Sequence, residues 1–251
     1  MTPERIVLGW SGGKDSSLAL RKIIAEGRYE VASLLTTCTE GFRRVSMHGV
    51  RCSLLKRQAE ALRLPCRKVF VPQNCSNEDY ERVMREACLE FKRVGITKVA
   101  FGDLFLEEIR AYRDRMLGEI GMSAVYPVWG LNTPQLAREF IREGFRASLV
   151  CVDSEKLDVS FAGRAFDESL LASLPASVDP CGENGEFHTF VHAGPIFRQP
   201  VACELGAVVQ HDCELGAVVQ HGRFCFADLL PQIRSIKKKK KTKVSQLTKK
   251  L

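Results

Sequence analysis

The stretch from Ile6 to Leu20, IVLGWSGGKDSSLAL, constrains the fold of this chain more than any other. The apolar run at 6–8 predicts a buried strand, and apolar residues return at helical spacing from Leu18 onwards. Between them lie two glycines and Lys14, so backbone N–H groups and a cation meet at the start of a helix. This order predicts a phosphate cradle, with an ordinary glycine turn as the alternative. It is not a Walker loop, because GxxxxGK[ST] is absent.

The SGGKDS segment resembles the signature of the PP-loop ATP pyrophosphatases, which cleave ATP between its α and β phosphates. The resemblance implies that ATP is bound here and that Lys14 and Asp15 take part in catalysis. The residues that we assign to the cradle are Ser11, Gly12, Gly13, Lys14, Asp15, Ser16 and Ser17.

Strands and helices are expected to alternate through the next hundred residues. Apolar runs predict strands at 29–37, 66–71, 97–101 and 124–129, and amphipathic patterns predict helices at 52–64, 77–94 and 104–118. Such alternation indicates an α/β fold with a Rossmann-like parallel sheet. Ligands of these sheets lie beyond the carboxyl ends of the strands, which makes Thr36 and Gly102 candidates for nucleotide binding. Asp103 is a candidate Mg²⁺ ligand, or else the N-cap of the following helix.

Two polar segments near these strand ends supply further candidates. The loop 46–51, SMHGVR, contributes Met47 and His48 as nucleotide-binding candidates and Arg51 as a substrate-binding candidate, because loops at strand ends carry much of the chemistry of such folds. On the charged helix at 104–118, Arg110 and Arg113 are the side chains that we expect to point toward phosphate or substrate. A solvent-exposed charged face is the alternative for that helix.

The character of the chain changes after residue 130. Thr133 and Pro134 predict a helix start with Thr133 as N-cap, followed by a strand at 146–152 and a helix at 166–174. We therefore expect a PP-loop ATP-binding domain at 1–130 and a smaller α+β substrate-binding domain at 131–234. CELGAVVQH occurs at 203–211 and again at 213–221, and predicts either a hairpin that turns near Asp212 or an inserted loop. The lysine-rich tail at 235–251 is expected to be disordered and is a candidate contact for RNA or an acidic partner.

A second chemical cluster lies at 179–189, DPCGENGEFHT. It places two carboxylates, an amide, an imidazole and a hydroxyl around two glycines. A strand from Phe187 onward would put Glu186 and His188 on one face. Metal binding, acid–base chemistry, substrate binding and a plain polar hairpin all suit this composition. The candidate catalytic residues are Glu183, Glu186 and His188, and the candidate substrate-binding residues are Asn184 and Thr189.

SGGKDSS, SMHGVR, FGDLFLEEIRAYR, PVWG and DPCGENGEFHTFV with GPIF together resemble the diphthine–ammonia ligase (diphthamide synthase) family, from Ile6 to about Phe197. The resemblance is to its short form, without the extra C-terminal domains of full-length eukaryotic members. It implies a HUP-type Rossmann-like domain, ATP with Mg²⁺, and amidation of a carboxylate by ammonium through an acyl-adenylate. In eukaryotes and archaea that carboxylate is diphthine on translation elongation factor 2, whereas short bacterial relatives act on another carboxylate. The alternatives are a PP-loop tRNA-modifying enzyme and a non-catalytic adenine-nucleotide-binding module.

The amino-acid composition bears on the class of protein and on which of these functions is favoured. Hydrophobic residues make up 45% of the chain, enough for a globular core. No apolar run approaches the ~20 residues of a membrane span, and no secretory signal is evident, so a cytoplasmic protein is expected. The ten cysteines include no CxxC pair, which argues against a zinc ribbon. The basic tail accounts for the net charge of +7, and the slightly acidic body shows no nucleic-acid footprint.

Overall fold

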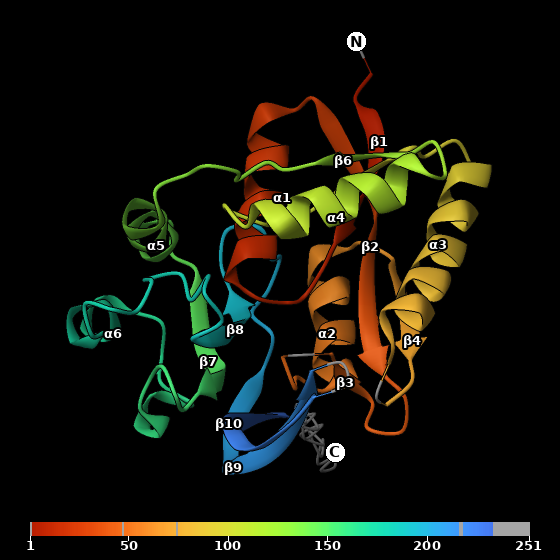
Figure 1. Cartoon of the computed structure of the whole chain (residues 1–251). Helices are drawn as coiled ribbons and strands as arrows, with labels where there is room; N and C mark the ends of the chain where they lie inside the picture. The colour runs from red at the N-terminus through yellow and green to blue at the C-terminus, as the bar shows by residue number, and fades with distance from the viewer. Residues whose placement is uncertain (1, 47, 74, 216–217, 233–251) are drawn as a thin grey trace, which may run out of the picture.

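The computed structural model describes residues 2–46, 48–73, 75–215 and 218–232. A largely parallel sheet covered by helices lies beside a smaller antiparallel sheet (Figure 1). The predicted fold class, α/β with a Rossmann-like sheet and a second, smaller α+β unit, is confirmed. Among the described residues, no helix combines the length and the apolar character that crossing a membrane requires.

The first sheet has the parallel strand order β4-β2-β1-β5-β6. These strands are β1 (Glu4–Gly9), β2 (Tyr29–Thr39), β4 (Cys66–Val71), β5 (Lys98–Ala100) and β6 (Ser123–Val125), and the short β3 (Arg44–Val45) pairs antiparallel with the end of β2. The chain order changes direction between β1 and β5. That position is the topological switch point, where α/β sheets bind their ligands.

Helices cover both faces of this sheet because successive strand residues point to opposite sides. Ile6 and Leu8 of β1 pack into a core with α1 (Lys14–Glu26) and α2 (Cys52–Leu62). Val7 packs into a second core with α3 (Asn77–Arg93) and α4 (Glu107–Gly118). The parallel strands are therefore buried on both faces, which accounts for their nearly continuous apolar sequences.

The second sheet has the antiparallel order β8-β7-β10-β9. Its strands are β7 (Arg146–Asp153), β8 (Phe187–Ala193), β9 (Cys203–Leu215) and β10 (Val218–Pro231), accompanied by α5 (Thr133–Arg142), α6 (Glu168–Ser173) and a 3₁₀ turn at Val159–Phe161. Phe140 of α5 and Phe187 of β8 belong to the same core cluster as Ile6 of β1, so the two sheets share a hydrophobic interior. The division into domains at 1–130 and 131–234 remains a prediction.

Two predicted helix starts are wrong. The N-cap of α5 is Asn132, whose side chain accepts a hydrogen bond from the backbone N–H of Gln135 at 3.0 Å. Thr133 is instead the first residue of α5, and its hydroxyl donates to Asp179 Oδ2 at 2.5 Å. The helix predicted from residue 104 begins instead at Glu107 after the N-cap Leu106, so Asp103 is not a helix cap.

The repeat forms a hairpin, although not with the predicted turn. β9 continues through Asp212 to Leu215, and Leu215 pairs with Val218 at the start of β10. The turn predicted near Asp212 is therefore wrong, and the second copy of the repeat is divided between the two strands. Met47 and the tail at 235–251 lie outside the described residues, so the predictions made for them stay predictions.

Candidate functional site

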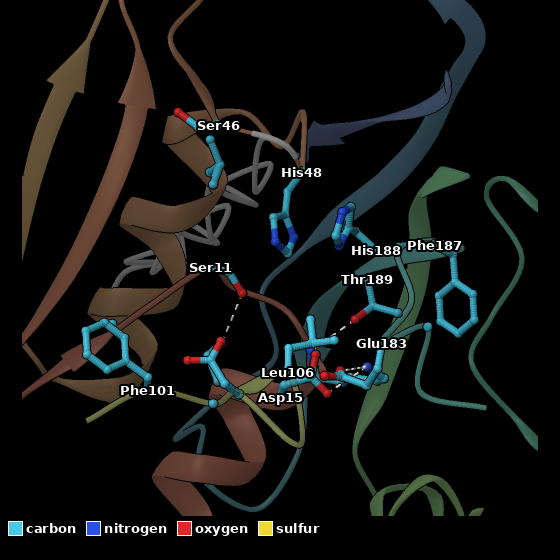
Figure 2. A pocket seen from close by; sticks show the side chains of 18 of the residues that line it. Ser11, Asp15, Ser46, His48, Phe101, Leu106, Glu183, Phe187, His188 and Thr189 are labelled. Atoms are coloured by element: carbon cyan, nitrogen blue, oxygen red, sulfur yellow. Dashed lines mark hydrogen bonds and ion pairs between the residues drawn. The ribbon is translucent and has the colours of Figure 1, made fainter. Parts of the chain in front are cut away.

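A cavity of about 770 Å³ lies at the switch point, between the carboxyl ends of the parallel strands and the second sheet. Its walls come from the glycine loop after β1, the loops after β2 and β5, and the GENGEFHT segment before and within β8 (Figure 2). This volume is in the range of small-molecule and cofactor sites. Segments that are more than 170 residues apart in the chain therefore form one pocket.

The glycine loop presents the amino end of α1 to this cavity. The N-cap is Gly13, which has no side chain to satisfy the first N–H groups of the helix. Ser11 Oγ accepts from the Gly13 N–H at 3.2 Å, and Thr189 Oγ1 of β8 accepts from the Lys14 N–H at 3.0 Å. The hydroxyls of Ser16 and Ser17 turn back to the Gly13 carbonyl. The start of α1 therefore lies at the cavity, and β8 helps to hold it in place.

A buried glutamine fixes the shape of the loop. Gln58 of α2 accepts from Trp10 Nε1 at 3.0 Å and donates to the carbonyl oxygens of Gly12 at 3.0 Å and Val191 at 2.6 Å. Gly12 has φ +81°, and a Cβ there would lie 2.7 Å from Gln58 Oε1. Glycine is therefore required at position 12 by both its backbone angle and its close neighbour.

Lys14 is the central charge of the site. It is 2% exposed, and its Nζ lies 2.6 Å from Asp15 Oδ1 and 3.8 Å from Glu183 Oε1. Burial alone would lower the pKa of Lys14, but Asp15, with smaller contributions from Cys181 and Glu183, outweighs burial and holds that pKa above its ordinary value. Burial raises the pKa of Asp15, and burial together with the charge of Asp15 raises the pKa of Glu183 to about 8.

The GENGEFHT segment is organised by Glu186, whose side chain turns into its own loop. Glu186 is 2% exposed, and its carboxylate accepts from the backbone N–H groups of Asp179 and Asn184, both at 2.9 Å. β8 begins only at Phe187, so the strand alternation that would place Glu186 beside His188 does not extend to it. Glu186 does not line the cavity, whereas Glu183 and His188 do.

Two histidines from distant segments form a stacked pair in the cavity wall. The rings of His48 and His188 have centroids 4.3 Å apart and planes inclined by 30° (Figure 2). Burial, His188 and Lys14 together place the pKa of His48 well below its ordinary value. Burial and Lys14 lower the pKa of His188 to about 4. Both imidazoles are therefore neutral at neutral pH.

Asp103 and Arg113 form an ion pair beside the cavity. Arg113 Nε lies 2.8 Å from Asp103 Oδ2, and the guanidinium lies 4.0 Å from the centroid of the Phe101 ring. Gly102 brings this segment against the glycine loop, because a Cβ at Gly102 would lie 2.7 Å from the backbone carbonyl carbon of Asp15. No group of three or more His, Cys, Asp or Glu side chains in the described ranges could hold a metal ion. A metal here would need ligands from a bound substrate.

The cavity brings together most of the predicted site residues. Those that line it are Ser11, Lys14, Asp15, Ser16, His48, Gly102, Asp103, Arg113, Glu183, Asn184, His188 and Thr189. Those that do not are Gly12, Gly13, Ser17, Thr36, Arg51, Arg110 and Glu186. The Thr36 hydroxyl donates to the Trp10 carbonyl, Arg51 forms a bidentate pair with Asp228 of β10, and the Arg110 guanidinium lies over the rings of Tyr126 and Trp129.

Sequence reasoning did not identify a charged group on the second-sheet side of the cavity. Asp153 is buried at the end of β7 and is held by Arg223 Nε at 2.8 Å, and Lys156 lies nearby. Asp153 follows an apolar strand just as Asp103 does, so the same signal could have identified it. Arg223 had no such signal.

The family models that match this chain include almost all of the residues that line the cavity. The model of the diphthamide synthase N-terminal domain matches residues 4–124, and that of the diphthamide synthase C-terminal domain matches residues 132–213. A diphthine–ammonia ligase of Homo sapiens is 22% identical over 249 residues, which cover 90% of this chain and 92% of that protein. One of Mus musculus is 23% identical, over 80% of this chain and 83% of that protein.

A diphthine–ammonia ligase of Schizosaccharomyces pombe is 22% identical over 80% of this chain but only 36% of its own length. Extra length beyond the aligned region is therefore a feature of that protein and not of every eukaryotic relative, which corrects the expectation drawn from the sequence.

Proposed function

This chain belongs to the diphthamide synthase family, and from that premise we propose that it is an ATP-dependent ligase that converts a carboxylate to an amide with ammonium. AMP and pyrophosphate are the proposed products, and an acyl-adenylate is the proposed intermediate. Diphthine is the acceptor that the names of the relatives favour, and we propose that it is carried on translation elongation factor 2. A related carboxylate is the second candidate.

One observation carries the proposal: the glycine loop with the start of α1 and the GENGEFHT segment share a cavity and touch each other. The Lys14 backbone N–H donates to Thr189 Oγ1 at 3.0 Å, and Lys14 Nζ lies 3.8 Å from Glu183 Oε1. A triphosphate at the amino end of α1 would therefore have its α-phosphorus within the same enclosure as an acceptor held by the second sheet. Amide synthesis by adenylation needs that proximity.

The residues present fit the first chemical step. The acceptor carboxylate attacks the α-phosphorus and pyrophosphate leaves, so negative charge on the phosphates must be stabilised. Lys14 would supply that stabilisation, together with the first-turn N–H groups of α1 that follow the Lys14 N–H, which already donates to Thr189. Ammonia then displaces AMP from the acyl carbon.

Mg²⁺ is also part of the proposal. Asp103 lines the cavity and would supply an oxygen ligand of the kind that Mg²⁺ prefers, and substrate phosphates would supply further oxygen ligands. Arg113 already neutralises that carboxylate, so the metal would have to share Asp103 with it. When bound, the metal would offset phosphate charge.

Product analysis tests the function. With ATP, ammonium and diphthine-bearing elongation factor 2, we expect stoichiometric AMP, pyrophosphate and amide, measured by chromatography and mass spectrometry. Formation of ADP would contradict the proposal. Co-purifying tRNA that stimulates AMP formation would favour a tRNA-modifying enzyme, and ATP binding without turnover with any carboxylate would favour a nucleotide-binding module.

Replacing Gly102 with alanine should weaken ATP binding by about 10-fold, because the overpacking cost of roughly 1–3 kcal/mol would fall on the first turn of α1. The new methyl group would meet the backbone of Asp15 at 2.7–2.8 Å and the Ser16 nitrogen at 2.9 Å. Gly118→Ala is the matched control, since no atom lies within 4 Å of a Cβ there. Titration calorimetry with ATP measures both variants, and wild-type affinity in Gly102→Ala would refute this expectation.

A further inference from the structure

Two buried cysteines from separate elements have their sulfur atoms in contact. The Sγ atoms of Cys38 on β2 and Cys52 on α2 lie 2.8 Å apart. Even carbon atoms, which are smaller, pack at roughly 3.5–4.0 Å, whereas the S–S bond of a disulfide is about 2.05 Å long. A small movement would therefore bring the two sulfurs within bonding distance. The proposed function uses neither thiol.

The backbone holds both cysteines in place. Cys38 pairs with Val45 of β3 on one side and with Phe70 of β4 on the other. Cys52 is the first residue of α2, and its N–H donates to the Arg43 carbonyl at 2.9 Å. The strands β2 and β3 and the start of α2 come together there (Figure 1). Strand pairing and a helix start therefore set the short distance between the sulfurs.

The two sulfurs differ in reactivity. The hydrogen bond with Cys38, aided by the charge of Lys68, outweighs burial and lowers the pKa of Cys52 to about 7. A position at the start of a helix also favours a thiolate. The same hydrogen bond, together with burial, raises the pKa of Cys38. Because Cys52 is 8% exposed and Cys38 is fully buried, an oxidant would attack Cys52 first, and Cys38 would react with the product.

A bound metal and a third thiol are the competing explanations for this pair. A structural zinc ion takes four ligands, and among the residues that the structure describes no three His, Cys, Asp or Glu side chains could hold an ion. Cys66 of β4 is near enough for its charge to act on Cys38, so it is the rival partner. We propose that Cys38 and Cys52 form a reversible disulfide when the protein meets a peroxide.

The chemistry balances with hydrogen peroxide as the oxidant. The Cys52 thiolate attacks one peroxide oxygen, the O–O bond breaks, and hydroxide leaves with the electron pair and takes up a proton to form water. The Cys38 sulfur then attacks the sulfur of the Cys52 sulfenic acid. The S–O bond breaks, and the departing hydroxide takes the Cys38 proton to form a second water. The two sulfurs are oxidised and the peroxide is reduced, and a thiol reductant reverses the bond.

The disulfide would close a loop that forms part of the cavity wall. Ser46 and His48 lie between the two cysteines in the chain, and both line the cavity. Arg51 ties the same loop to Asp228 of β10. The bond would therefore fix this wall covalently at its base. By closing a loop of about 15 residues, it should also stabilise the folded chain against unfolding.

Peptide mapping tests the bond directly in the full-length wild-type chain. Trypsin cleaves after lysine and arginine, which places Cys38 in peptide 29–43 and Cys52 in peptide 52–56. After treatment with hydrogen peroxide and blocking of the remaining thiols, mass spectrometry should find these two peptides joined. Dithiothreitol should separate them. Two separate peptides after oxidation, or Cys52 joined to Cys66, would overturn the proposal.

Thermal unfolding measures what the bond does to the fold. Oxidised wild-type protein should unfold about 6–12 °C above the reduced protein, because the closed loop lowers the entropy of the unfolded chain. Cys38→Ala should abolish this difference, whereas Cys66→Ser, at the neighbouring thiol, should retain it. Equal unfolding temperatures of the oxidised and reduced wild type would overturn the stabilising role, and that comparison holds even if Cys38→Ala does not fold.

ATP binding tests whether the bond fits the present cavity, and this measurement alone rests on the proposed function. Because the sulfurs already lie 2.8 Å apart, oxidation should leave the cavity wall in place. ATP affinity in calorimetry should then agree within about threefold between the oxidised and reduced forms. A loss of more than about 10-fold would show that the bond needs another arrangement of the loop, against the proposal. If neither form binds ATP, the proposed function fails and the peptide map still decides on the disulfide.

Discussion

Alanine at position 14 should abolish ATP turnover, with AMP formation reduced by at least about 1,000-fold. Lys14 is the one residue of the glycine loop whose side-chain cation reaches both the amino end of α1 and the GENGEFHT segment. Its removal withdraws the positive charge that would stabilise the phosphates. Without Lys14, the carboxylates of Asp15 and Glu183 would repel each other with no cation between them. Steady-state release of pyrophosphate measures the effect.

A second variant separates catalysis from folding. Losing one partner of a buried ion pair costs about 3–5 kcal/mol, so Lys14→Ala could lose activity by unfolding. Lys14→Met combined with Glu183→Gln removes the cation together with one of the carboxylates that it faces, and should recover part of that stability in urea denaturation while staying inactive. Lys22→Ala, on the same helix but paired with Glu139, is the control. Turnover by a folded Lys14 variant would refute the assignment of the phosphate cradle.

The fold was predictable where its determinants are local. Alternating apolar runs and amphipathic helices located every strand of the parallel sheet within a few residues, because burial on both faces leaves a strong sequence signal. The errors arose where a distant residue decides the outcome. Thr133 has the sequence of an N-cap, yet Asn132 caps α5, and the Thr133 hydroxyl donates to Asp179, 46 residues later.

The site shows the same contrast. The glycine loop is a contiguous motif, so its position at the end of β1 followed from the sequence alone. Arg110 and Arg113 have similar local surroundings in the sequence, but Arg113 reaches the cavity and Arg110 lies over Tyr126 and Trp129. Gln58 gave no signal at all, because a glutamine in an amphipathic helix is unremarkable until the loop it holds is known.

The structure assigns the predicted importance of Glu186 to a different cause than the sequence suggested. Sequence reasoning placed it beside His188 as a catalytic group, whereas its carboxylate accepts from the backbone of Asp179 and Asn184 and from the Asn184 side chain. Glu186 is therefore a positioning residue, which sets the loop that carries Glu183. Glutamine has one acceptor oxygen in place of two, so one of these donors would face an amide N–H group instead.

Glu186→Gln should consequently lower the free energy of unfolding by about 1–3 kcal/mol and reduce amide formation by about 100-fold through displacement of Glu183. ATP affinity should stay within about threefold of wild type, because Glu186 does not line the cavity and the glycine loop is held independently by Gln58 and Thr189. Urea denaturation, ATP calorimetry and amide formation measure the three quantities. Glu60→Gln, an exposed glutamate of α2, controls for charge removal and should change stability by less than about 0.5 kcal/mol. An equal loss of ATP affinity and amide formation in Glu186→Gln would show that the two halves of the cavity are not separable, because the loop before β8 would then be part of the phosphate site itself.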